Sequence, residues 1–203
     1  MYNISTSINV FTERGAIMAT SNDVPSWASV ICENSTSTSP ADILEDLMAA
    51  PECAAFGPVH HFLVGAALLA SVRNATGSGD LRGQLQELSE RSGAVPGGAC
   101  ARWGVCGAAA SCGMALSILL GNAPLKAEGW SETQKMVADL LGQIAQAGSP
   151  RCCKRDSRVA VRGSVRWFNE VLGVDLRQPT SEPVCAVSSD NVACIGARCP
   201  YHS

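Results

Sequence analysis

The stretch WGVCGAAASCGMALSILLGNAPL, from Trp103 to Leu125, contains no charged residue. It is long enough to span a bilayer as a helix, for which about 20 apolar residues are needed. However, Gly, Ala, Ser and Cys make up most of it, and Asn122 and Pro124 lie near its end. Small side chains let helices pack closely. We therefore predict a central, closely packed helix and no membrane span.

Helical periodicity continues on both sides of this segment. Ser39 and Pro40 are a typical cap and first residue of a helix, and Asp80 caps another helix that Gly93 ends. The apolar spacing predicts helices at about 40–48, 58–75, 81–92, 131–147 and 151–172. The sequence has no alternating strand pattern and no internal repeat. We therefore predict an all-α fold, a compact bundle-like helical domain with a cysteine-rich C-terminal loop after Gln178.

The beginning of the chain differs from the rest. Residues 1–38 are rich in Ser, Thr and Asn, and the run STSTS occupies 35–39, which is typical of a flexible segment. Residues 39–203 are long enough for a single domain. Hydrophobic residues make up 46% of the chain and charged residues 16%, which predicts a packed globule. The net charge of −3 gives no general attraction to nucleic acid or to an anionic membrane.

Ten cysteines are the outlying feature of the composition. Cysteines in such number serve as disulfides, metal ligands or redox thiols. Disulfides require an oxidising compartment and therefore an export signal. Residues 1–20 lack a basic stretch followed by an apolar run, because Glu13 and Arg14 interrupt them. We therefore expect a cytoplasmic protein whose cysteines bind a metal or act in redox chemistry.

Three cysteines near the C-terminus, Cys185, Cys194 and Cys199, have the spacing C-x8-C-x4-C-P. Iron–sulfur clusters are held by cysteine thiolates on irregular backbone, often with a proline after the last ligand. Asn191, Gly196 and Ser188 can turn this loop and direct amide hydrogens at cluster sulfurs. Zinc also takes thiolate ligands, but the C-x2-C pairs typical of zinc sites are absent. The tail therefore favours an iron–sulfur cluster, with zinc as the alternative.

A second set, Cys100, Cys106 and Cys112, has the spacing C-x5-C-x5-C. On a helix that begins near Gly104, Cys106 and Cys112 do not share a face. Cys100, on the preceding turn, can approach Cys106 in the first helical turn, where the helix dipole favours a thiolate. Cys100 and Cys106 are thus candidate metal ligands, whereas Cys112 is predicted to be a core residue.

The adjacent Cys152 and Cys153 open the last predicted helix. Neighbouring residues on a helix point in different directions, so either one can complete the tail site while the other faces elsewhere. A strained disulfide between the two is the alternative.

Arginines follow at helical spacing and lie within an arc of roughly 80°; they are Arg151, Arg155, Arg158, Arg162 and Arg166. Exposed helix charges add little stability. Stability therefore does not explain why five arginines share one face. We expect this stripe to be solvent-accessible and to attract an anion: a thiolate-bound cluster, an anionic ligand or an acidic partner. A plain solvated face is the alternative.

His60 and His61 precede an apolar run, and Cys53 lies a few residues upstream. A histidine pair beside a cysteine can ligate a metal or donate protons, although a purely structural role is common. Cys32, in the N-terminal segment, has no predicted role.

Five strings resemble an uncharacterised cysteine-rich family of anaerobic bacteria and archaea, whose members occur alone or appended to methyltransferase-like domains. The strings are HHFLV from His60, PGGxC ending at Cys100, CGAA from Cys106, PRCCKR from Pro150 and CIGxxCP from Cys194. The resemblance covers about residue 52 to the end. It implies an anaerobic, cytoplasmic setting and a motif set of Cys100, Cys106, Cys152, Cys153, Cys185, Cys194 and Cys199. The CGAA string also distantly resembles redox proteins with a Cys-Gly-Cys-Ala signature.

These observations lead to one expected function and one alternative. The first is a protein that binds an iron–sulfur cluster, of the 4Fe–4S type, and acts in redox or sulfur/methyl-group chemistry with a redox or methyltransferase-type partner. The alternative is a structural zinc or thiol-redox module that serves a partner enzyme. Motifs of nucleotide-binding proteins and hydrolases, such as GxGxxG after a strand, HExxH and GxSxG, are absent.

Overall fold

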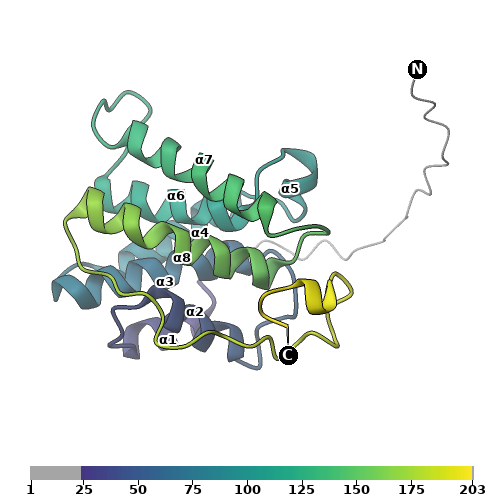
Figure 1. Cartoon of the computed structure of the whole chain (residues 1–203). Coiled ribbons are helices and arrows are strands. Elements are labelled where there is room, and N and C mark those ends of the chain that lie inside the picture. The colour runs from purple at the N-terminus through teal and green to yellow at the C-terminus, as the bar shows by residue number, and fades with distance from the viewer. Residues whose placement is uncertain (1–23, 203) are drawn as a thin grey trace, which may run out of the picture.

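The computed structural model describes residues 24–202, which form eight α-helices and one 3-10 helix (Figure 1). They are α1 (Ser26–Asn34), α2 (Pro40–Ala49), α3 (His60–Thr76), α4 (Leu81–Gly93), α5 (Ala99–Arg102), α6 (Gly107–Leu120), α7 (Trp130–Gln146), α8 (Cys153–Leu172) and η1 (Gly196–Arg198). No strand occurs between residues 24 and 202, which confirms the all-α class. None of the helices within this range is long and apolar enough to cross a membrane.

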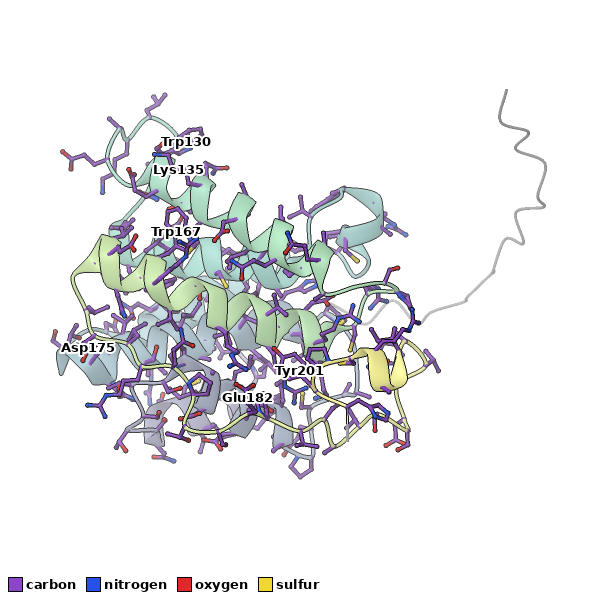
Figure 2. All side chains as sticks on the ribbon, in the orientation of Figure 1. Trp130, Lys135, Trp167, Asp175, Glu182 and Tyr201 are labelled. Atoms are coloured by element: carbon purple, nitrogen blue, oxygen red, sulfur yellow. The ribbon has the colours of Figure 1, made fainter. Side chains whose placement is uncertain are left out.

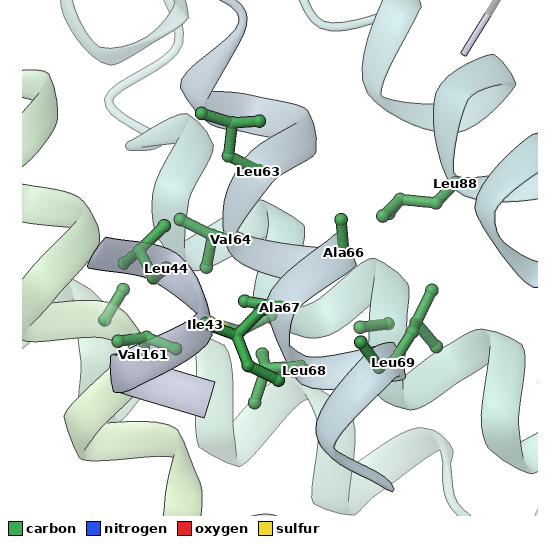
Figure 3. Packing of buried hydrophobic residues seen from close by; sticks show 14 of the residues in the cluster. Ile43, Leu44, Leu63, Val64, Ala66, Ala67, Leu68, Leu69, Leu88 and Val161 are labelled. Carbon is green, nitrogen blue, oxygen red and sulfur yellow. The ribbon is translucent and has the colours of Figure 1, made fainter. Parts of the chain in front are cut away.

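Helix α3 lies at the centre of the bundle and contacts α1, α2, α4, α6 and α8. Every residue from Phe62 to Val72 is buried, as expected for a helix that is apolar on all sides. Ile43 and Leu44 of α2, Leu88 of α4 and Val161 of α8 belong to the core that surrounds it (Figure 3). The core is therefore continuous across the bundle.

Small residues bring α6 very close to α3. The backbone N–H of Gly65 donates a hydrogen bond to Ser111 Oγ at 2.8 Å. A Cβ atom on Gly65 would come within 2.9 Å of that oxygen and 2.8 Å of Leu88. The closely packed central helix predicted from the uncharged segment is thus confirmed. It begins only at Gly107, because Cys106 before it has extended backbone angles.

Helix α1 corrects the expectation that residues 1–38 form a flexible segment, at least over Ser26–Asn34. The side chains of Ala28 and Cys32, four residues apart, are fully buried. The Arg73 guanidinium at the end of α3 donates to the carbonyl oxygens of Cys32, Glu33 and Ser35. The Ser- and Thr-rich composition of residues 1–38 gave no indication of this short apolar face of α1. Residues 1–23 lie outside the described part of the chain.

Cysteines and histidines that the sequence singles out lie at one end of the bundle. The N-terminal end of α8 lies at this end, and the C-terminal segment runs along the molecule and finishes beside it (Figure 1). Each of α3, α6 and α8 begins within a few residues of cysteines or histidines that the sequence singles out. The fold thus brings together residues that are distant in sequence.

The contact between α3 and α6 can be tested with two glycine substitutions. We expect Gly65→Ala to destabilise the protein by about 1–3 kcal/mol, because the added methyl has no space. Gly142, on the exposed face of α7, has nothing within 4 Å of a built Cβ atom. Gly142→Ala should therefore stabilise by up to about 1 kcal/mol through helix propensity. Urea denaturation measures both, and a Gly65→Ala variant as stable as the wild type would contradict the close packing.

Candidate metal centre

A small cavity of about 20 Å³ lies between the start of α8 and the C-terminal segment. Four cysteines line it: Cys152, Cys185, Cys194 and Cys199. The other lining residues are Arg155, Arg158, Ser188, Asn191, Ile195 and His202. Within residues 24–202, no three His, Cys, Asp or Glu side chains converge closely enough to hold a single ion. The cavity thus brings the three predicted tail cysteines to the same wall as one cysteine of the vicinal pair, although not close enough to hold one ion.

Cys152 is held by the first turn of α8. It is the N-cap residue, with extended backbone angles, and its side chain is buried. Its backbone N–H donates to Asp156 Oδ2 at 3.2 Å, and its carbonyl accepts from the Asp156 N–H at 2.8 Å. This reciprocal pair satisfies polar groups that a helix start leaves unpaired. It also fixes the backbone from which the Cys152 thiol projects.

The tail folds back on itself to bring its cysteines together. The N–H of Cys185 donates to the carbonyl of Tyr201 at 2.7 Å, which closes the loop. Inside the loop, the N–H of Cys194 donates to Asn191 and that of Cys199 to Gly196, each at 2.8 Å. Gly196 has a φ of +59°, a conformation that favours glycine. Local turns thus supply three thiols without regular secondary structure beyond η1.

Two polar groups donate hydrogen bonds to cavity sulfurs. The buried Asn191 donates through Nδ2 to Cys152 Sγ at 3.3 Å, and its Oδ1 accepts from the Ala193 N–H. The N–H of Gly196 approaches Cys194 Sγ at 3.4 Å. Donors to sulfur of this kind stabilise thiolates and sulfur-bound metals. Asn191 and Gly196 are two of the three residues for which the sequence predicted this role, and the third, Ser188, also lines the cavity.

The arginine stripe of α8 is not the solvent-accessible surface that the sequence predicted. Arg155 and Arg158 are only 1% and 4% exposed. Arg155 bonds Asp156, and Arg158 makes two contacts of 2.7 Å with Glu45 of α2. The prediction is wrong for these two arginines because α2 and the tail cover that side of α8.

The other arginines of the stripe are less buried. Arg162 pairs with Glu182 of the tail, and Tyr201 lies close to the same pair (Figure 2). Arg158 also lies over the Tyr201 ring, 5.2 Å from its centroid. Arg151 is exposed and contacts Cys153 Sγ at 3.3 Å. Two arginines of the stripe, Arg158 and Arg162, therefore fasten the tail to α8.

Cys153 does not line the four-cysteine cavity. Its neighbours are Arg151 and the backbone of Gly57 before α3, and burial raises its thiol pKa. Nearby, the buried Lys154 donates to the carbonyl of Met48 at 3.2 Å and to Cys53 Sγ at 3.5 Å. Cys53 and Cys153 are thus placed at the same end of the molecule, but neither lines the cavity.

The two histidines do not reach the cavity either. His60 is buried and contacts the Gly57 carbonyl through Nδ1 at 3.1 Å. Burial, with the nearby charge of Lys154, lowers its pKa to about 4. Burial also lowers the pKa of His61, whose ring lies against Gly107. Both side chains are therefore neutral at neutral pH.

Cys106 and Cys100 form a separate pair of neighbours. Burial raises the pKa of Cys106 to about 11, despite hydrogen bonds from the backbone of α6, and the nearby Cys100 contributes to the increase. The expected thiolate at this helix start is thus outweighed by desolvation. Cys112 is fully buried in the core, as predicted.

Sequence reasoning missed several residues around the cavity. Tyr201 and His202 are adjacent to the tail motif but carried no pattern of their own. Asp156 follows Cys152 by four residues, a spacing at which an acidic side chain can cap a helix start. That spacing could have identified Asp156 in advance.

The fold and the cavity define an all-α, cysteine-rich protein with thiols gathered at one end. Its sequence matches a family of unknown function, DUF5714, over residues 29–202, and the chain belongs to this family. The resemblance to an uncharacterised family is confirmed at this level, and the match extends further toward the N-terminus than expected. The chain matches no curated protein and no solved structure.

Two ion pairs of α8, Arg158–Glu45 and Arg162–Glu182, give a matched test of how α2 and the tail are held against this helix. In the Arg158–Glu45 pair the side chains are 5% and 32% exposed. Because Glu45→Ala leaves a buried guanidinium unpaired, we expect a loss of roughly 2–3 kcal/mol, below the cost for a fully buried pair. Glu182 is 75% exposed, so Glu182→Ala should cost less than about 1 kcal/mol. Urea denaturation compares them, and equal losses would contradict the assigned burial.

Proposed function

We propose that this protein binds an iron–sulfur cluster, of the 4Fe–4S type, through Cys152, Cys185, Cys194 and Cys199. The observation that carries the proposal is the shared cavity: three tail cysteines and one from α8 line it together. Four cysteine thiolates on irregular backbone are the usual ligands of such a cluster. Cys152, not Cys153, is the fourth ligand in this proposal.

The surroundings of the four thiols support an anionic centre. Asn191 and Gly196 donate hydrogen bonds to cavity sulfurs, and Arg155 and Arg158 add positive charge to the wall. A cluster bound by four thiolates carries net negative charge, which these groups offset. Such a cluster supplies one-electron chemistry when bound. The residues of this chain hold it and control its charge environment.

The size of the cavity bears on which metal is bound. A volume of about 20 Å³ is that of about one water molecule. A single zinc ion, with Zn–S distances of about 2.3 Å, needs less space than a cluster. A cluster requires the tail to move outward, which its scarcity of regular structure permits. No three of the described His, Cys, Asp or Glu side chains converge closely enough to hold one ion, so zinc requires the thiols to move closer together. Structural zinc, in a module that serves a partner enzyme, is the second candidate.

We place this function in the reducing cytoplasm of an anaerobic organism. All ten cysteines lie within the described residues and none forms a disulfide, which supports a reducing compartment. The cluster would act in redox or sulfur/methyl-group chemistry with a redox or methyltransferase-type protein partner. The resemblance noted from the sequence supports this wider setting.

Anaerobic purification tests the proposed centre directly. We expect a coloured protein that contains iron and acid-labile sulfide, with an electron paramagnetic resonance signal after reduction. Alanine substitution of a cavity cysteine should remove most of the metal, because each supplies one ligand. The variants are Cys152→Ala, Cys185→Ala, Cys194→Ala and Cys199→Ala.

Three other cysteines provide controls for that experiment: Cys32→Ala, Cys112→Ala and Cys153→Ala should keep the wild-type metal content. A colourless protein with stoichiometric zinc would replace the cluster proposal by the zinc candidate. A wild-type protein that binds neither iron nor zinc would refute the metal centre itself. Equal loss of metal in Cys152→Ala and Cys153→Ala would contradict the assignment of Cys152 alone.

A further inference from the structure

Arg155 is the most deeply buried charged side chain at the cavity, with 1% exposure. Its Nε donates to Asp156 at 3.1 Å. Its Nη2 donates to the carbonyl oxygens of Gly148 at 2.6 Å and Pro150 at 2.9 Å. Nη1 is also buried, yet no group in the described chain accepts its hydrogen bonds. One nitrogen of a buried, permanently charged guanidinium is thus left without a partner.

A buried donor without an acceptor is costly, so native proteins rarely keep one. Because Arg155 cannot lose its proton, it cannot escape this cost by becoming neutral. Arg155 lines the cavity together with four cysteine sulfurs. An acceptor available to Nη1 at this wall is therefore sulfur, either as a thiolate or as the sulfide of a bound group.

Arg158 also lines the cavity, but its donors already have partners, Cys185 among them. Its Nε and Nη2 both bond Glu45. Arg155 alone combines a place on the cavity wall, nearly complete burial and a nitrogen without a partner among the residues described. Its charge lies on the cavity wall and away from solvent, where screening is weak.

We infer that Arg155 is a positioning residue for the centre, and that its Nη1 donates a hydrogen bond to a sulfur of the bound group. This inference rests on the proposed function. It assigns an electrostatic role as well: a nearby positive charge and a hydrogen bond both favour the more negative, reduced state of a sulfur-bound metal. Arg155 therefore raises the reduction potential of the centre and strengthens its retention.

Two substitutions separate the charge from the hydrogen bond. Arg155→Lys keeps the positive charge but lacks the planar fork, and Arg155→Met removes both. Redox titration of the reconstituted protein, followed by electron paramagnetic resonance, should give a lower potential for Arg155→Lys and a still lower one for Arg155→Met. Loss of metal to a competing chelator should be faster in the same order. Circular dichroism reports whether each variant is folded.

Arg166→Met is the matched control. Arg166 lies on the same helix, pairs with Asp139 and has a side chain that is 60% exposed, so its loss should leave potential and retention unchanged. If the wild type holds zinc, chelator competition alone is the readout and the same order is expected.

Different outcomes overturn different statements. A wild type without iron, sulfide or zinc refutes the centre. A loaded wild type whose potential and retention match those of both Arg155 variants overturns the role of Arg155 and leaves the centre standing. If both variants fail to fold while Arg166→Met folds, Arg155 serves only the turn before α8, and the inference is wrong.

Discussion

The geometry of the cavity depends on the contacts of the buried Arg155 guanidinium. It bonds the carbonyl oxygens of Gly148 and Pro150, in the turn before α8, and the carboxylate of Asp156. Asp156 in turn accepts a hydrogen bond from the N–H of Cys152. One ion pair thus fixes the turn, the first turn of the helix and the backbone of a candidate ligand. Buried ion pairs are expensive in desolvation, so this pair contributes position more than stability.

The tail depends on α8 because it has almost no core of its own. From residue 179 to 202, only Asn191 and Tyr201 are buried. Arg162 and Glu182 fasten one part of the tail, and the stacking of Tyr201 over Arg158 fastens another. A segment held by a few polar contacts opens more readily than a packed core. Binding of a group by three tail thiols would therefore contribute directly to the order of the tail.

The sequence predicted local features well and tertiary burial poorly. Apolar periodicity located most of the helices, and the close spacing of Cys185, Cys194 and Cys199 grouped in advance three cysteines that line one cavity. The choice of Cys152 over Cys153 was open, because the direction of a side chain at a helix start depends on what packs beside it. The arginine stripe was misjudged for a similar reason. Helical spacing shows that arginines share a face, but not that another segment covers it.

The surroundings of each thiol, more than the number of thiols, distinguish candidate ligands from packing residues at this end of the molecule. Cys106 lies among apolar groups, its pKa is raised to about 11, and it is protonated at neutral pH. His60, with a pKa of about 4, adds no positive charge at neutral pH. In the cavity beside the start of α8, two arginines and four cysteines share the wall, and two N–H donors bond the sulfurs of Cys152 and Cys194. A negatively charged cluster requires fixed positive charge and hydrogen-bond donors directed at sulfur, and the cavity combines both with four cysteines.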